Sequence, residues 1–538
     1  MVTKRRFLAL ESNLVNSSDF NTCIDSHDYG CQPQGNVYLS ADRSCRQLGV
    51  VLTDVLLQDI FSFCDGITLA ILVQTSREFY VIGHQPELWR DLVLREAKGH
   101  AVTNVGACWK DTYVLKQQSH CENIIHKPLK IAGFFSDHFF QTHICRSFVI
   151  PNKWLTIENG TVDRVEEMSI EKFLENYEIP NRPVVLAGAC KDWKAMNWKC
   201  KEYLLQTLQS EKERSFRATS GAAPFAAHFT LESYLDYCES YQLEEAPLYL
   251  FDREALLDGP LREDYFPHLQ RDCPYFDPNR TKENTHDLLH LLGESRRPDH
   301  TWLIVGPQRS GSSFHIDPNA THAWNATIVG RKRWLFYPPG QTPPGIYPSP
   351  DGDDVIMPIS VGEWLTKYWD AHVERCQLSS SIERPIECTV QAGDVVFIPH
   401  GWWHSVLNLD APYNIAITHN YVSKSNLSNV LRFFENKQSQ ISGCRDRPGI
   451  ALQPEALGNE FTKALRQHYP TWLQQAQQTR KWTCRAWEDR KNDIDASKKE
   501  HKWGNRKKKS KTENVKGNVF AKVKQQKEKS LGFSFSFL

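Results

Sequence analysis

The chain has 538 residues, a length that corresponds to about two to four domains, and its 64 basic residues balance its 64 acidic ones. That balance excludes a global electrostatic field that would draw the whole protein to nucleic acid or to a membrane surface. A hydrophobic fraction of 40% excludes a chain that is disordered throughout. No stretch reaches the roughly 18 consecutive apolar residues of a membrane helix, so we expect no membrane partner. The 15 cysteines contain no Cys-x-x-Cys pair, which indicates reduced thiols in an intracellular protein.

Residues 1–46 are interrupted by polar residues at short intervals and are predicted to form a flexible leader. A small helical domain is predicted over 47–97. Its first helix begins behind a Thr or Asp cap, and residues 52–63 place apolar side chains at helical spacing before Gly66 ends it. A helical unit of about 50 residues has a marginal core, so a partner that covers its exposed apolar face would stabilise it.

Nine residues of this helical domain match, in type and in order, the sequence pattern of a known family of small helical modules. They are Leu52, Ile60, Phe61, Phe63, Val73, Arg77, Phe79, Leu88 and Trp89. With this order the domain resembles an F-box, although Thr53 stands where that family has proline. The resemblance implies docking on a Skp-type adaptor of a cullin–RING ubiquitin ligase. The alternative is a helical cap that packs only on the next domain.

Residues 98–147 are predicted to be a connector, and a mixed pattern of strands and helices occupies 148–425. Many short apolar runs bounded by glycine and proline favour a β-barrel or jelly roll with accompanying helices, an α+β architecture. The expected strands are 184–186, 248–251, 302–305, 327–329, 334–337, 395–398 and 413–418, and a capped helix is expected over 169–177.

A helical extension is predicted over 426–490, with helices at 425–435 and 454–478. Residues 491–538 are rich in lysine and hold too few apolar residues for a core, so we predict a disordered tail. The basic run at 505–511 indicates a nuclear import signal or an RNA-binding patch, and a solvating tail is the alternative. We therefore expect a nuclear protein, with the cytoplasm as a second location.

Histidine followed two residues later by an acid occurs three times, about as often as the composition predicts by chance, so frequency alone singles out no pair. The pairs are His120/Glu122, His315/Asp317 and His372/Glu374. Residues i and i+2 share a face on an extended segment but not on a helix. Only the second pair lies in a predicted strand, between Gly311 and Pro318, whereas His372 lies in a predicted helix and His120 in a polar connector.

The third ligand of a metal site at His315 and Asp317 must come from a strand that the fold brings alongside. His400 and His404 both compete for that role. Two histidines and one carboxylate, with a cation such as Lys332 nearby to hold an acid, are the parts of a non-haem iron site. A lysine buried without an acidic partner would be costly. The alternative for Lys332 is a surface lysine in a Lys-Arg run.

Five sequence blocks in one order link 148–425 to a known family. They are His315–Pro318, Ala323–Ala326, Gly330–Trp334, Pro399–His404 and Ile415–Thr418. With these blocks the region resembles a Jumonji-C 2-oxoglutarate dioxygenase with the double-stranded β-helix (cupin) fold. It is most similar to the arginine-demethylase/lysyl-hydroxylase branch of that family.

The resemblance implies a role for each matching position. It makes His315, Asp317 and His404 the iron ligands and pairs Lys332 with the distal carboxylate of 2-oxoglutarate. His400 stands where the family has glycine. The remaining positions that would contact the cosubstrate are Thr418, Asn325, Tyr249 and Ser312, the last in place of a threonine. One residue more separates His404 from Thr418 than in that branch.

The resemblance also implies the activity and its partners. Iron(II), 2-oxoglutarate and dioxygen are the expected cofactor and cosubstrates, with ascorbate as reductant. The expected reaction is lysyl hydroxylation or N-methyl demethylation of lysine or arginine in a protein, for which a histone or an RNA-binding protein is a candidate. An alternative of another class is an F-box substrate adaptor whose cupin domain acts only as a binding module.

Overall fold

The computed structural model describes most of the chain. The described residues are 27–33, 52–117, 128–158, 160–221, 223–240, 244–257, 259–272, 287–378, 380, 383–444 and 451–479. His120, the predicted tail over 491–538 and most of the predicted leader lie outside them. None of the helices within these ranges is long and apolar enough to cross a membrane.

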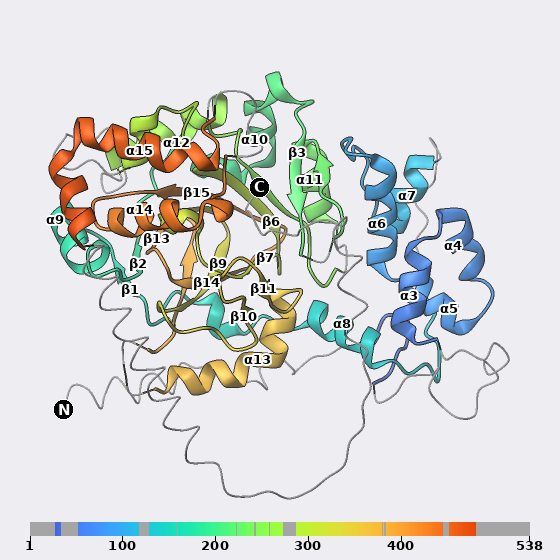
Figure 1. Cartoon of the computed structure of the whole chain (residues 1–538). Helices are drawn as coiled ribbons and strands as arrows, with labels where there is room; N and C mark the ends of the chain where they lie inside the picture. The colour runs from blue at the N-terminus through green and yellow to red at the C-terminus, as the bar shows by residue number, and fades with distance from the viewer. Residues whose placement is uncertain are drawn as a thin grey trace, which may run out of the picture.

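Two β-sheets build the body of the molecule (Figure 1). The larger sheet has the strand order β1-β2-β13-β8-β15-β6-β5-β3-β4 and the smaller one β12-β9-β14-β7, while β10 and β11 form a separate ribbon. All pairings are antiparallel except that of β1 with β2. The strands are β1 Asp163–Val165, β2 Val184–Leu186, β3 Phe216–Thr219, β4 Ala227–Phe229, β5 Tyr249–Asp252, β6 Thr301–Pro307, β7 Gly311–His315, β8 His322–Val329, β9 Arg331–Tyr337, β10 Tyr347–Pro348, β11 Val355–Ile356, β12 Ile386–Gln391, β13 Val395–Ile398, β14 Trp403–Asn408 and β15 Tyr413–Tyr421.

This arrangement agrees with the expected jelly-roll core accompanied by helices. The helices are α3 Asp54–Ser62, α4 Gly66–Leu72, α5 Arg77–Gly83, α6 Pro86–Ala97, α7 Trp109–Gln117, α8 Asp137–Ser147, α9 Ile170–Phe173, α10 Lys201–Thr207, α11 Leu231–Glu239, α12 Pro260–Asp272, α13 Val361–Cys376, α14 Leu427–Asn436 and α15 Pro454–His468. Helix α11 packs on strands β4, β6 and β15 of the larger sheet, and α13 packs on β7 and β14 of the smaller one. Both sheets are therefore covered by helices, and the space between them is left for a buried site.

Two expected helices differ from those in the structure. The helix expected over 454–478 is broken, because α15 ends at His468 and a further helix occupies 470–479. Tyr469 at the break has a φ of −137°, and a residue that precedes proline, here Pro470, is disfavoured in helical geometry. The helix expected over 169–177 begins as α9, with Ser169 as its cap, and continues as a π-helical turn from Leu174 to Glu178.

Helices α3 to α7 gather on one side of the barrel, drawn in blue in Figure 1. The Thr53 hydroxyl caps α3 by accepting a hydrogen bond from the backbone N–H of Leu56. The helical unit is tied to the barrel by an ion pair between Arg90 of α6 and Glu244, which lies just before β5. Both side chains are fully buried, so the contact is part of a shared core. The predicted connector between the two units contains helices α7 and α8.

Candidate active site

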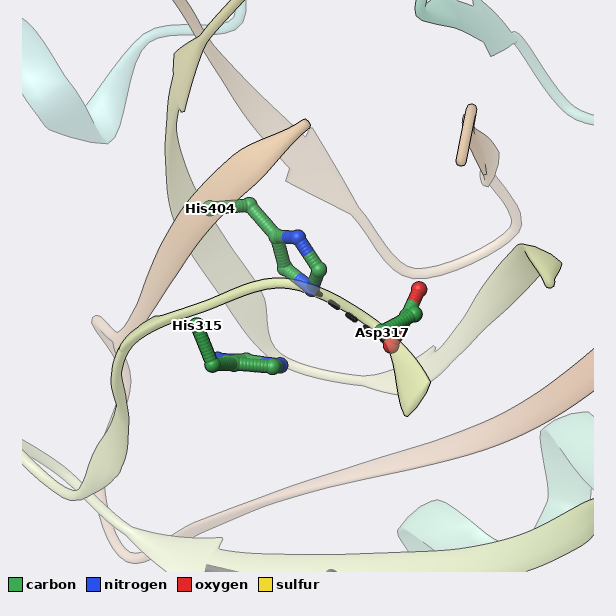
Figure 2. A group of neighbouring side chains, drawn as sticks. All are labelled: His315, Asp317 and His404. Atoms are coloured by element: carbon green, nitrogen blue, oxygen red, sulfur yellow. Dashed lines mark ion pairs between the residues drawn. The ribbon is translucent and has the colours of Figure 1, made fainter. Parts of the chain in front are cut away.

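Three side chains, carried by strands β7 and β14 and by the residues just after β7, lie close together (Figure 2). Strand β7 pairs with β14 so that His315 lies directly opposite His404, and Asp317 follows just beyond the end of β7. One ligand atom from each of the three lies within 4.8 Å of the others. A Cβ atom at residue 311 would lie 1.9 Å from the carbonyl oxygen of Val406, so glycine is required for this approach of the strands.

Hydrogen bonds orient both imidazole rings toward a shared metal position. Nδ1 of His315 lies 2.8 Å from the carbonyl oxygen of Ser313, and Nδ1 of His404 lies 3.1 Å from that of Trp402. Because a carbonyl only accepts, each Nδ1 carries the proton and each Nε2 presents the lone pair through which a neutral imidazole binds a metal. Nε2 of His404 is 3.9 Å from Oδ1 of Asp317, as the dashed line in Figure 2 marks.

The protonation states of these groups suit a divalent metal. Burial, reinforced by the neighbouring His404, lowers the pKa of His315 to about 3. Burial lowers the pKa of His404 to about 4 and raises the pKa of Asp317 to about 6. At pH 7 the site therefore offers two neutral imidazoles and a carboxylate. Oδ2 of Asp317 is buried and finds no hydrogen-bond partner among the described residues, so the residues present fit a metal ion.

All eight residues expected to contact the metal or the cosubstrate line one cavity between the two sheets. They are Tyr249, Ser312, His315, Asp317, Asn325, Lys332, His404 and Thr418. The larger sheet supplies Tyr249, Asn325 and Thr418, and the smaller one supplies His404 and Lys332. The barrel thus brings together residues that are separated by up to 169 positions in the chain, from Tyr249 to Thr418.

Lys332 lies buried at 1% exposure, and its Nζ donates a hydrogen bond to the Tyr249 hydroxyl at 3.1 Å. Burial lowers the pKa of Lys332 to about 7. A buried ammonium without an anion is unfavourable, so this end of the cavity is suited to a carboxylate ligand.

Two further polar side chains lie side by side on the opposite wall. Thr418 of β15 and Asn325 of β8 are direct partners in the sheet, so their side chains share a face. The Thr418 hydroxyl donates to the carbonyl of Trp324 at 3.0 Å and keeps its lone pairs. Oδ1 of Asn325 is buried without a hydrogen-bond partner in the described part of the chain. These groups provide hydrogen-bonding capacity for a polar ligand.

Comparisons with known proteins agree with this geometry. A family model described as a cupin-like domain matches residues 170–427. The chain is 37% identical over 486 residues to the arginine-specific demethylase JMJ22 of Arabidopsis thaliana, which covers 88% of each chain. The chain belongs to the Jumonji-C family. The resemblance inferred from the five sequence blocks is thereby confirmed.

Two other relatives of this Jumonji-C protein are matched over smaller shares. The bifunctional arginine demethylase and lysyl-hydroxylase psr-1 of Caenorhabditis elegans is 31% identical over 282 residues, which is 50% of this chain and 62% of that protein. The 2-oxoglutarate and iron-dependent oxygenase JMJD4 of Homo sapiens is 32% identical over 234 residues, or 41% of this chain and 49% of that protein.

Sequence reasoning missed several residues of the Jumonji-C cavity, among them Phe251, Trp302 and Asn420. Asn420 follows Thr418 by two positions on β15, so strand alternation placed it on the same face and was the signal available for finding it. Phe251 follows Tyr249 in the same way on β5.

Two histidines that the sequence offered as alternative metal ligands, His400 and His372, lie away from the cavity of this Jumonji-C protein. Nε2 of His400 contacts the side-chain amide of Asn429 at 2.6 Å, and its ring packs against His322. His372 lies on α13, where its Nδ1 contacts the Tyr337 hydroxyl at 2.8 Å. His404, and not His400, completes the group with His315 and Asp317.

Proposed function

We propose that this protein is an iron(II)- and 2-oxoglutarate-dependent oxygenase that acts on lysine or arginine side chains of proteins. The observation that carries the proposal is the single cavity in which His315, Asp317 and His404 face a buried lysine. A module that only binds its target requires neither a metal triad nor a buried cation beside it. The names of the relatives, which include demethylases and oxygenases, support the same conclusion.

The protein's own residues bind and orient the reactants. His315, Asp317 and His404 would hold iron by three ligands, which leaves open positions for the cosubstrate and dioxygen. Lys332 and Tyr249 would hold the distal carboxylate of 2-oxoglutarate at the inner end of the cavity. When bound, iron and 2-oxoglutarate supply the oxidising chemistry, in which dioxygen converts 2-oxoglutarate to succinate and carbon dioxide and hydroxylates a carbon of the substrate. His404 and Lys332 are buried and His315 and Asp317 are half-buried, so the site limits the access of water to this chemistry.

Succinate production tests the proposal without knowledge of the target. We expect purified protein with iron(II), 2-oxoglutarate and ascorbate, the proposed reductant, to form succinate slowly. His404→Ala and Lys332→Ala should abolish it, because they remove a metal ligand and the carboxylate partner. His400→Ala, which changes a histidine of the turn before β14 that lies outside the metal group, should retain it. Absence of turnover in the native chain, together with absence of stabilisation by 2-oxoglutarate, would favour the adaptor alternative.

Hydroxylation and demethylation differ in the carbon that receives the oxygen. Oxygen on an N-methyl carbon gives an unstable product that releases formaldehyde, whereas oxygen on a side-chain carbon is retained. Mass spectrometry of lysine-rich and methylated-arginine peptides from histones and RNA-binding proteins therefore separates the two reactions. A retained oxygen atom identifies a hydroxylase, and loss of a methyl group with formaldehyde identifies a demethylase.

A second function is proposed for the helical unit, namely docking on a Skp-type adaptor of a ubiquitin ligase. Helices α3 and α4 bury Leu57, Phe61 and Leu69 but leave a separate apolar face in solvent. Its exposed side chains are Val55, Leu56, Ile60, Phe63, Ile67 and Ile71. Six exposed apolar side chains within residues 55–71 of a small helical unit are typical of a protein-binding surface.

Binding of purified Skp-type adaptor, measured by calorimetry, tests this docking. Phe63 is 84% exposed, so Phe63→Asp should abolish binding with little change in the melting temperature. Ile179→Asp is the matched control, because Ile179 is 68% exposed but lies outside the helical unit. Adaptor binding that survives Phe63→Asp, or that is never detected, would leave the helical unit as a cap on the barrel.

Nuclear location and RNA association are proposed for residues 491–538 on their lysine-rich sequence alone. Imaging of the full chain against a chain that ends at residue 490 tests the nuclear location, because deletion of the basic run should return the protein to the cytoplasm. RNA binding through the tail should weaken steeply with salt and vanish in the same truncated chain. Equal distribution of both chains, or RNA binding that ignores salt, would contradict these proposals.

A further inference from the structure

An asparagine without an assigned role lies beside the buried lysine of the cavity on the neighbouring strand. Asn408 of β14 is the direct partner of Lys332 on β9, so the two side chains project from the same face of the smaller sheet. Asn408 is fully buried. A buried amide in this place costs free energy unless its hydrogen-bonding groups are used.

The hydrogen-bond network fixes which way the Asn408 amide points. The Ser310 hydroxyl donates its only proton to the carbonyl oxygen of Pro307 at 2.5 Å. Its oxygen must therefore accept the hydrogen bond from Nδ2 of Asn408, which is 2.8 Å away. This leaves Oδ1 of Asn408 as an acceptor, and within the described ranges it has no hydrogen-bond partner.

The same network packs against the tyrosine that contacts Lys332. A Cβ atom at residue 306 would lie 2.4 Å from both Ser310 Oγ and Tyr249 Cδ2, so Gly306 allows these two side chains to meet. Burial raises the pKa of Tyr249, and a hydrogen bond from the Asn408 side chain opposes that rise. Asn408 therefore lies between the serine anchor and the Tyr249–Lys332 pair.

We propose that Asn408, anchored by Ser310, is a positioning residue that holds Lys332 and Tyr249 for the distal carboxylate of 2-oxoglutarate, an inference that rests on the proposed oxygenase function. A lysine ammonium has three N–H donors. The Tyr249 hydroxyl takes one, and the neutral Oδ1 of Asn408 is available to a second without cancelling the positive charge. The charge and the remaining donor then stay available to the cosubstrate.

This role explains why an amide suits the position better than a carboxylate would. An aspartate at 408 would form an ion pair with Lys332 and compete with the carboxylate of the cosubstrate. It would also place a carboxylate oxygen against Ser310 Oγ, whose proton is already donated to Pro307. Aspartate would therefore keep the shape of the Asn408 side chain but oppose binding of the cosubstrate's distal carboxylate.

Calorimetric binding to the Mn(II)-loaded full chain tests the inference with two probes. The first is 2-oxoglutarate, and the second is 2-oxobutyrate, which has the same keto-acid group but lacks the distal carboxylate. We expect Asn408→Asp to lower the affinity for 2-oxoglutarate at least about tenfold, while the affinity for 2-oxobutyrate changes less than about twofold. Ser310→Ala should lower the affinity for 2-oxoglutarate by about threefold and leave the affinity for 2-oxobutyrate nearly unchanged.

Asn414→Asp is the matched control. Asn414 is also fully buried with an unpartnered Oδ1 among the described residues, but its Nδ2 donates to the backbone carbonyl of Asp410 and it lies outside the cavity. This variant should leave the ratio of the two affinities unchanged. If Asn408→Asp does not fold, the altered ratio in Ser310→Ala carries the test.

Equal weakening of both probes, or an unchanged ratio in Asn408→Asp and Ser310→Ala, would overturn the inference while leaving the oxygenase proposal intact. If the native chain binds 2-oxoglutarate and 2-oxobutyrate with equal affinity, both the inference about Asn408 and the oxygenase proposal would be overturned.

Discussion

Binding of 2-oxoglutarate to the metal-loaded protein should take up a proton, because a buried lysine must regain its charge. Burial lowers the pKa of Lys332 from 10.5 to about 7. The distal carboxylate of the cosubstrate favours the charged form and raises that pKa again. The bound state then holds more protons than the free state above pH 7, so the affinity for 2-oxoglutarate falls as the pH rises.

The expected size follows from the lowered pKa. At pH 8 about one tenth of the free protein carries the Lys332 proton, so binding should take up about 0.9 proton. At pH 6 the lysine is already charged, and the uptake should fall to about 0.1 proton. Above pH 8 the affinity should decrease about tenfold per pH unit.

Calorimetry of the Mn(II)-loaded protein in HEPES and in Tris measures the uptake, because the two buffers differ in ionisation enthalpy. The control ligand 2-oxobutyrate should bind without proton uptake, since it has no distal carboxylate for Lys332 to meet. Uptake close to zero at pH 8, or equal at pH 6 and pH 8, would show that binding does not change the charge of Lys332 in the expected way and would refute the reasoning.

Two further predictions concern the framework of the site. Gly311→Ala should lower the affinity for Mn(II) at least about tenfold, because the new Cβ would meet the carbonyl oxygen of Val406 and separate the strands that carry the histidines. Unchanged metal titration of this variant would contradict the requirement for glycine. Glu244→Ala should lower the free energy of unfolding in urea by about 3 kcal/mol, because buried Arg90 loses its fully buried partner and retains the ion pair with the partly exposed Asp91. Asp163→Ala removes the exposed ion pair between Asp163 and Arg182 and should lower the free energy of unfolding by only about 0–1 kcal/mol. Equal losses of stability in the two variants would contradict a special role for the buried pair.

Local patterns in the sequence predicted the β-barrel class, and the family resemblance carried by the five blocks predicted the chemistry of the site. Strand 395–398 was predicted with the bounds that the structure has, because alternation and bounding turns are local signals. The ordered blocks around His315 and His404 singled out the three side chains that the structure brings together, although three His-x-acid pairs are present in the chain. The broken helix at Tyr469 shows the limit of periodicity, since Pro470 overrode an apolar pattern that continued past it.

What the sequence by itself determined is which residue types and which strands are present, because composition and alternation are properties of neighbouring residues. Only the tertiary structure decided which distant residues meet. The pairing of β14 with β9 places Asn408 opposite Lys332, and the docking of α6 buries Arg90 against Glu244, 154 positions away. No local pattern encodes these contacts, because strand register and helix docking follow from packing the whole core. The electrostatics of the site arise at the same level, since Lys332 has a lowered pKa only because both sheets remove it from water.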